Sequence, residues 1–328
     1  MNPIGDLYKE RLTMMKSIRL IAVLFLLLAL ILSSCSPEGV WNLPSSSSSS
    51  EETPWTWISG SNTIDQVGIH GKKNVAAASN IPGARSGSVS WIDSGGNLWL
   101  FGGNGYDSTG YNGNLNDLWK FDGTNWTWVS GSNTINQVGI YATQGTAYSS
   151  NIPGARSGSV SWIDSGGNLW LFGGNGYDST GYNGNLNDLW KFDGTNWTWV
   201  NGSNTSDQVG IYGTKGVAAA SNIPGARSNS VSWIDSSNNL WLFGGYGYDS
   251  AGTYVTMNDL WKFDGTNWTW MSGSNTIDQV GIYGTKGVAA ASNIPGARSG
   301  SVSWIDSSGN LWLFGGAGYM NDLWRYQP

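Results

Sequence analysis

The sequence predicts an all-β protein built from repeats, and three observations support this. From Pro54 onward the chain repeats every 71 residues, each repeat is rich in Trp and Gly, and each contains four short segments of strand character. The 328 residues include 21 Trp and 48 Gly, and only 12% are charged. Abundant aromatic residues with little charge are typical of folded chains and not of disordered ones. A period of this length with β-type content is typical of a β-propeller or a related array.

The register of the repeat is marked by one arginine in each copy. The copies are so similar that Arg85–Val129 and Arg156–Val200 are identical. The four arginines are Arg85, Arg156, Arg227 and Arg298.

In the first repeat we expect strands at Ser88–Ile92, Leu98–Phe101, Leu118–Phe121 and Trp126–Val129. Tight turns rich in Asp, Gly and Asn join the first strand to the second and the third to the fourth, which predicts hairpins. Apolar residues on both faces indicate a sheet packed between neighbouring sheets. Each repeat should therefore form a four-stranded antiparallel blade, with the longer connections, such as 104–114 and 130–155, emerging at one end.

The last repeat stops at Trp324-Arg325-Tyr326-Gln327-Pro328 and lacks its own fourth strand. The sequence Trp55-Thr56-Trp57 matches the missing strand, so we expect it to complete the last blade and close the ring, which would remove two exposed strand edges. This gives sixteen strands in four blades. An alternative is a recently expanded array whose ring closes only by association with a second chain.

The repeat resembles the kelch repeat of kelch and galactose oxidase-like propellers. The matching residues are Gly102-Gly103 after an apolar strand, Asn116-Asp117-Leu118-Trp119, and Trp126. The resemblance covers residues 54–328 and implies a kelch-type β-propeller, although the units are longer and fewer than is usual. The same pattern recurs at Gly173-Gly174 with Trp190 and Trp197, at Gly244-Gly245 with Trp261 and Trp268, and at Gly315-Gly316 with Trp324.

The N-terminal segment has the pattern of an export signal. Lys16 and Arg19 precede the apolar run Leu20–Leu32, which is too short to span a bilayer but suits a signal peptide. The following Ser33-Ser34-Cys35 resembles a bacterial lipobox, which implies lipidation of Cys35 and membrane anchoring at the outer membrane or cell surface. We therefore expect an export signal at 1–34, a flexible Ser-rich tether at 35–53 and the propeller at 54–328.

Composition excludes several kinds of chemistry. The chain has one Cys, one His and no Glu after Glu52, which argues against zinc sites, a Ser-His-Asp triad and disulfides. A net charge of −6 argues against nucleic-acid binding. Galactose oxidase chemistry would imply copper held by Tyr and His with a cross-linked Cys. Because Cys35 lies in the export signal and His70 is alone, we expect neither copper nor another cofactor or metal. His70 aligns with Tyr141, Tyr212 and Tyr283 and is interpreted as a simple substitution.

The repeat arginines are the first candidate site. Each begins the first strand of its blade, so Arg85, Arg156, Arg227 and Arg298 could ring the mouth of a central channel and bind a carboxylate or phosphate. The kelch resemblance also implies ligand-binding arginines here. The alternative is that each arginine pairs with a repeat aspartate such as Asp117 and fixes the long loop.

A second candidate site is the loop 104–114, which carries Tyr106, Asp107, Tyr111 and Asn112. Aromatic and amide side chains suit contacts to a sugar or a peptide, although Gly-, Asp- and Asn-rich loops are also ordinary turns. The equivalent residues in the next two repeats are Tyr177, Asp178, Tyr248 and Asp249.

Near-identical repeats favour multivalent recognition over catalysis, which needs a few unlike residues that converge once. We therefore expect a non-catalytic module that binds protein or glycan through its loop-rich end. The alternative is a carbohydrate-active enzyme that uses Asp and Arg at the channel mouth. We expect a monomer unless a second chain completes the ring.

Overall fold

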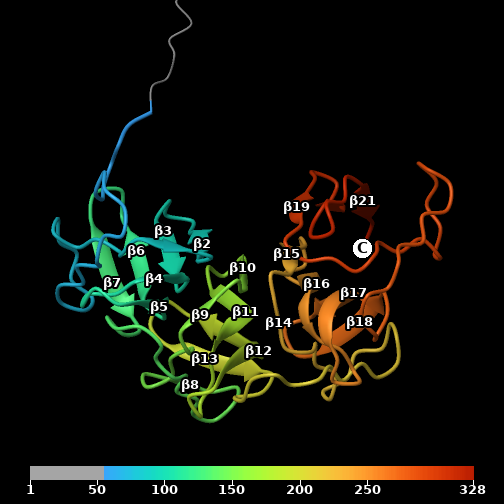
Figure 1. Ribbon diagram of the computed structural model, residues 1–328, viewed down its shortest axis with the longest axis horizontal. Coiled ribbons are helices and arrows are strands. Elements are labelled where there is room, and N and C mark those ends of the chain that lie inside the picture. The colour runs from blue at the N-terminus through green and yellow to red at the C-terminus, as the bar shows by residue number, and fades with distance from the viewer. Residues whose placement is uncertain (1–54) are drawn as a thin grey trace, which may run out of the picture. The chain divides into compact units, whose positions relative to one another are not determined.

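The computed structural model describes residues 55–328, and the unit Ile58–Pro328 consists of strands, turns and loops (Figure 1). Its sheets are antiparallel, which confirms the predicted all-β class. The expected export signal 1–34, the tether 35–53 and Cys35 lie outside the described residues. Within residues 55–328, no helix is long and apolar enough to cross a membrane.

Each repeat forms one main sheet, which we call a blade and number 1 to 4 in chain order. Blade 1 has the strand order β2 (Val89–Ile92), β3 (Leu98–Phe101), β6 (Leu118–Phe121) and β7 (Trp126–Ser130). Blade 2 has the order β10 (Val160–Ile163), β11 (Leu169–Tyr177), β12 (Asn183–Phe192), β13 (Trp197–Asn201) and β8 (Ala147–Tyr148). Blade 3 contains β15 (Val231–Ile234), β16 (Leu240–Tyr248), β17 (Tyr254–Phe263) and β18 (Trp268–Ser272). Blade 4 contains β19 (Val302–Ile305), β20 (Leu311–Phe314) and β21 (Leu323–Tyr326).

The middle hairpin of the first three blades extends beyond the predicted strands. In repeat 1, the extension is a separate sheet of β1 (Arg85–Ser86), β4 (Asn104–Tyr106) and β5 (Asn112–Asn114). In repeats 2 and 3, β9 (Arg156–Ser157) pairs with β11, and β14 (Arg227–Ser228) pairs with β16. The sequence predicted a plain loop here.

The two long connections meet at the hairpin end of the blades. The amide of Ser108 donates to the carbonyl of Asn133 at 3.0 Å, and the amide of Ile135 donates to the Asp107 carboxylate at 3.1 Å. The middle of the long connection before each of blades 1 to 3 instead follows the outer strand of that blade. The side chain of Asn151, for example, donates to the carbonyl of Trp197 at 2.9 Å. The predicted loop-rich end is therefore present, and part of the loop before each of blades 1 to 3 also covers a sheet edge.

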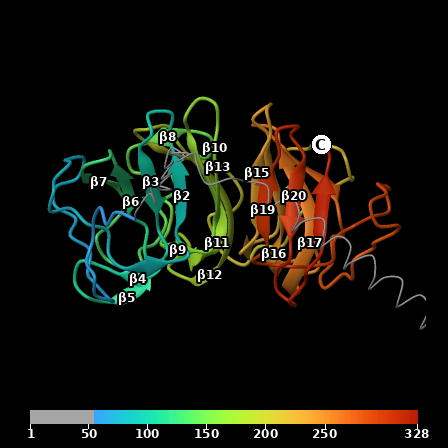
Figure 2. The same cartoon turned by 90° about the horizontal axis from the view of Figure 1, so that it is seen from above.

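Consecutive blades pack through apolar faces. The first strands follow one another as β2, β10, β15 and β19, with β10 beside β2 and β15 beside both β10 and β19 (Figure 2). Three hydrophobic clusters lie at the three junctions between consecutive blades. Trp119, Trp190 and Trp261, which are fully buried, belong to the third strands. Apolar side chains therefore lie on both faces of each blade that packs between two others.

Residues 58–328 show no closed ring of blades. Blade 4 has three strands, and residues 55–57 form no strand, with Trp55 fully exposed. Among the described residues, the hydrophobic clusters join blade 1 to 2, 2 to 3 and 3 to 4, and none joins 4 to 1. Closure of the last blade by Trp55-Thr56-Trp57 therefore stays a prediction.

Candidate functional site

The four repeat arginines each pair with an aspartate of their own blade. In blade 2, the Arg156 guanidinium donates through Nη1 and Nη2 to the two carboxylate oxygens of Asp188, at 2.6 and 2.7 Å. Its Nε donates to the carbonyl of Gly154 at 2.9 Å. Such bidentate, charge-assisted pairs are strong and fix geometry. The same pairs form between Arg85 and Asp117, Arg227 and Asp259, and Arg298 and Asp322.

These arginines are buried and do not form an exposed ring of cations. The side chains of Arg156 and Asp188 are both inaccessible to solvent. Tyr141 donates its hydroxyl to the same carboxylate at 2.6 Å, and Trp190 donates its indole N–H at 2.6 Å. The pair therefore fixes the long loop and the third strand around one carboxylate. The structure shows the pairing that the sequence left as an alternative to ligand binding.

His70 occupies the position of the loop tyrosine in blade 1. Its Nε2 lies 3.1 Å from a carboxylate oxygen of Asp117, where Tyr212 places its hydroxyl 2.7 Å from Asp259 in blade 3. The interpretation of His70 as a substitution within the repeat is confirmed by this shared position.

Electrostatics explains why the buried carboxylate stays ionised. Burial alone would raise the pKa of Asp117, but the Arg85 charge and the hydrogen bonds from Arg85, His70 and Trp119 outweigh it and hold the pKa well below its usual range. Hydrogen bonds from Arg298 have the same effect on the pKa of Asp322. Burial and the neighbouring Asp188 raise the pKa of Tyr141, so this hydroxyl remains a donor.

These lowered pKa values predict loss of stability in acid. A carboxylate with a lower pKa in the folded state stabilises the fold above its unfolded pKa of about 4 and loses this contribution as the pH falls through the folded value. We expect the thermal midpoint to be nearly constant between pH 7 and pH 5 and to fall steadily below about pH 4. Circular dichroism melts at stepwise pH would check this. An unchanged midpoint down to pH 2 would contradict the roles assigned to Asp117 and Asp322.

The predicted loop aspartates are also structural. Asp107, Asp178 and Asp249 are 1%, 2% and 2% exposed. One Asp178 oxygen accepts from the amide of Thr180 at 2.8 Å, and the other accepts from the amide of Ser206 at 3.0 Å. A carboxylate that accepts nearby amides in this way forms an Asx-type turn. Asp178 therefore joins the hairpin tip to the next long loop.

The most distinctive surface feature of the loop-rich end is a group of tyrosines, which we call the Tyr patch: Tyr182, Tyr246, Tyr248 and Tyr254. The Tyr248 and Tyr254 rings stack with centroids 4.8 Å apart and an interplanar angle of 28°. Tyr246 meets Tyr254 edge-on at 4.6 Å. Tyr182, from the preceding blade, is 62% exposed, and Tyr254 is 38% exposed. The patch thus presents aromatic surface from two neighbouring repeats.

Pairing in the third repeat positions this patch. Tyr248 lies opposite Tyr254 where β16 turns into β17, and Tyr246 lies opposite Thr256 on the same hairpin. Burial, followed by the charge of Asp207 and then Tyr254 and Tyr182, raises the pKa of Tyr248. Asp207 accepts the amide of Asn185 at 2.8 Å, so one of its oxygens is held by the preceding blade.

Of the predicted loop tyrosines, Tyr248 belongs to the Tyr patch, whereas Tyr106 and Tyr177 are half-buried on the equivalent hairpins. Sequence reasoning missed Tyr246 and Tyr254. Their signal is a departure from the repeat: Tyr246 stands where repeats 1 and 2 have Asn104 and Asn175, and Tyr254 replaces Asn112 and Asn183.

The arrangement offers both aromatic and polar groups to a ligand. Tyrosine combines an apolar ring with a hydrogen-bonding hydroxyl. Asp207, which accepts from the amide of Asn185, adds a carboxylate at the same end. Among residues 55–328, no group of three or more His, Cys, Asp or Glu side chains could hold a metal ion.

Comparisons with known proteins give distant structural likenesses. No protein-family model and no curated protein match the chain. The solved structure of YjhT is 16% identical with a TM-score of 0.36, and the match covers 75% of this chain and 82% of that one. A fungal alcohol oxidase of the AA5 family in complex with copper is 13% identical (TM-score 0.32), with 75% of this chain and 49% of that one covered. The glycoside hydrolase family 43 YxiA protein from Bacillus licheniformis is 10% identical (TM-score 0.34), with 73% and 55% covered. The chain spans about half the length of the latter two proteins.

Proposed function

We propose that this protein is a non-catalytic binding module that recognises a glycan through the Tyr patch. The observation that carries the proposal is the group of exposed and half-buried tyrosines at the junction of repeats 2 and 3. It lies at the loop-rich end, where the sequence predicted recognition. The repeat arginines and loop aspartates contribute by holding the hairpins in place.

The chemistry of the patch supports a sugar ligand. The apolar face of a pyranose ring packs on an aromatic ring, while its hydroxyls need donors and acceptors at the edge. Tyr182 and Tyr254 offer exposed aromatic surface, and the Tyr248 hydroxyl and Asp207 offer polar partners. The pairing of Tyr248 with Tyr254 across the hairpin holds two of the rings before any ligand arrives, which reduces the entropy lost on binding.

The proposal includes the setting expected from the sequence. The kelch-type propeller would be exported and held at the outer membrane or cell surface by lipid on Cys35. Two or more acyl chains on that cysteine would give stable anchoring, and the tether 35–53 would let the binding end reach its ligand.

The test is binding of the full chain to a glycan array, followed by titration of the best ligand. Tyr254→Ala should weaken binding at least about tenfold, which corresponds to about 1.4 kcal/mol. Tyr111→Ala is the matched control, because Tyr111 is an exposed tyrosine of the repeat 1 hairpin. It should bind like the unchanged protein.

Equal binding by Tyr254→Ala and the unchanged protein would reject the Tyr patch as the site. Capture of a protein and no glycan would assign the protein-binding version of the hypothesis. Release of new reducing ends from a bound glycan would assign the alternative function, a carbohydrate-active enzyme.

A further inference from the structure

The blade junctions bury the same apolar positions each time. At the first junction, Trp99 contacts Phe192 with ring centroids 5.9 Å apart, and Phe101 contacts Trp197 at 5.5 Å. At the second, the equivalent pairs are Trp170 with Phe263 at 6.0 Å and Phe172 with Trp268 at 5.5 Å. Each blade therefore has one face that packs onto the next blade, here called the leading face, and an opposite face that receives the previous blade, here called the trailing face.

A tryptophan hydrogen bond repeats with these contacts. The indole N–H of Trp162 donates to the carbonyl of Trp241 at 3.3 Å, and that of Trp233 donates to the carbonyl of Trp312 at 3.2 Å. At the first junction, Trp91 donates to the carbonyl of Trp162 at 2.8 Å. The leading face is thus defined by packing and by a directional polar contact.

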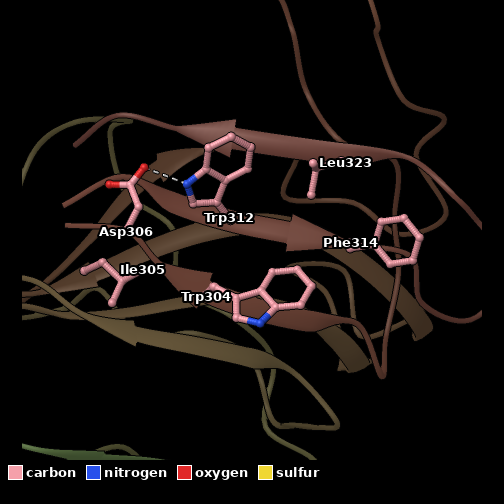
Figure 3. A pocket seen from close by; sticks show the side chains of 6 residues that line it. All are labelled: Trp304, Ile305, Asp306, Trp312, Phe314 and Leu323. Atoms are coloured by element: carbon pink, nitrogen blue, oxygen red, sulfur yellow. Dashed lines mark hydrogen bonds between the residues drawn. The ribbon is translucent and has the colours of Figure 1, made fainter. Parts of the chain in front are cut away.

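The leading face of blade 4 is exposed. Its Trp304 is 53% exposed, whereas the equivalent Trp91, Trp162 and Trp233 are 5%, 3% and 7% exposed. Phe314 is 39% exposed, against 1% for Phe101. Figure 3 shows Trp304, Trp312 and Phe314 on β19 and β20, with the Trp312 indole bonded to Asp306 at 2.8 Å. A surface with the same residues as a buried junction is suited to the same partner.

The trailing face of blade 1 is the matching surface. Leu98 is 43% exposed, while its blade 2 equivalent Leu169 is 2% exposed because blade 1 covers it. Trp126 is half-buried in blade 1, whereas its equivalent Trp197 is buried at the first junction. The exposed trailing face of blade 1 is therefore of the kind that the leading face of blade 4 would bind.

In the part of the chain that the structure describes, blade 4 has no outer strand for its loop to bind. In blades 1 to 3, an asparagine of the long loop donates to the carbonyl of the first Trp in the fourth strand; the donors are Asn80, Asn151 and Asn222. The equivalent Asn293 donates to Val288 within its own loop. In the sequence, the fourth strand of each of blades 1 to 3 is followed directly by the long loop of the next blade. The sequence Trp55-Thr56-Trp57 likewise comes directly before the long loop of blade 1 and matches the fourth strands.

We propose that the leading face of blade 4 binds the trailing face of blade 1 of a second copy, so that two copies form one eight-blade ring. Among residues 55–328 the chain's own blade 1 does not cover this face, because no hydrophobic cluster joins blades 4 and 1 and both Trp304 and Leu98 are exposed. Figures 1 and 2 show the four blades in their chain order. A head-to-tail interface of this kind forms closed rings when its rotation permits. Trp304 then donates to the carbonyl of Trp99 of the second copy, and Phe314 packs on Trp126 of that copy.

Cross-linking tests whether blade 4 binds blade 1 of a second copy or blade 1 of its own chain. Ser232 donates its hydroxyl to the carbonyl of Ser161 at 3.3 Å, so these equivalent positions meet at a junction. Ser90 of a second copy would meet Ser303 in the same way. The full chain, with Cys35→Ser and in mild detergent, is co-expressed as two tagged forms, one with Ser90→Cys and the other with Ser303→Cys. A short bis-maleimide should join the two forms into a covalent dimer of twice the chain mass.

Three controls make the outcome decisive. A single chain with Ser161→Cys and Ser232→Cys should cross-link within itself, which shows that the reagent spans a junction. Adding Trp304→Glu should reduce the dimer at least tenfold while the circular dichroism spectrum stays that of the folded chain, because Trp304 is exposed within its own chain. Absence of the dimer while the first control succeeds would overturn the proposal. Cross-linking within one chain that carries both Ser90→Cys and Ser303→Cys would also overturn it, in favour of closure by the chain's own blade 1.

Discussion

Replacing Asp259 with Asn should lower the free energy of unfolding by about 3–5 kcal/mol, the usual cost of removing one partner of a buried ion pair. The reason is that the Arg227 and Asp259 side chains are both inaccessible to solvent. The substitution would leave a buried guanidinium without a countercharge. It would also weaken the bonds from the Tyr212 hydroxyl and the Trp261 indole, which reach the same carboxylate at 2.7 Å each. Urea unfolding followed by Trp fluorescence measures the change.

The same substitution in the last blade provides the control. The Asp322 side chain is 15% exposed, so water can partly solvate the arginine when Asp322 becomes Asn. We expect a clearly smaller loss there. A loss of less than about 1 kcal/mol at Asp259, typical of a surface pair, would show that the buried pair does not hold the blade together.

Gly173→Ala should also lower the stability of the fold strongly, because it combines backbone strain with a steric clash. Gly173 has a φ of 62°, and an added Cβ would lie 2.8 Å from the carbonyl oxygen of Arg227 in the next blade. A non-glycine residue in the left-handed region costs about 1–3 kcal/mol, and overpacking typically adds about 1–3 kcal/mol. The expected result is a large fall in the midpoint of urea unfolding.

Gly194→Ala separates these two contributions. Gly194 has a φ of 94°, but an added Cβ would meet no atom within 4 Å. Its loss of stability should therefore reflect backbone strain alone. Equal losses of unfolding free energy for Gly194→Ala and Gly173→Ala would contradict this prediction. They would show that the close approach of blades 2 and 3 at Gly173-Gly174 does not contribute to the effect.

The core strands could be predicted from the sequence because their signals are local. Alternating apolar residues and flanking Asp-Gly and Asn turns located Leu98–Phe101 and Leu118–Phe121 with the bounds that the structure shows. The extension Asn104–Tyr106 with Asn112–Asn114 was missed, because Asn and Gly have low strand propensity. These residues pair because the preceding hairpin already brings their backbones together.

The candidate site was less predictable because its contacts are non-local. The sequence offered two roles for Arg156, and only the fold brings Asp188, 32 positions away, within 2.6 Å of its guanidinium. Asp178 was a candidate ligand-binding residue because it lies in a loop. In the structure its carboxylate accepts five hydrogen bonds that hold this loop. Tyr254 could have been found from sequence, since it breaks a repeat that is otherwise almost constant.

The loops that follow the outer strands have a consequence for solubility. An uncovered strand edge can act as a template on which other chains add, and this is where aggregates and fibrils begin. In blade 2, β8 lies along β13 and covers this edge, whereas within residues 55–328 β21 of blade 4 pairs with β20 alone. Aggregation through strand edges therefore has its main entry point at β21. Arg325 within that strand and Pro328 just after it are residues that discourage strand addition, and they protect the protein where its own loops do not.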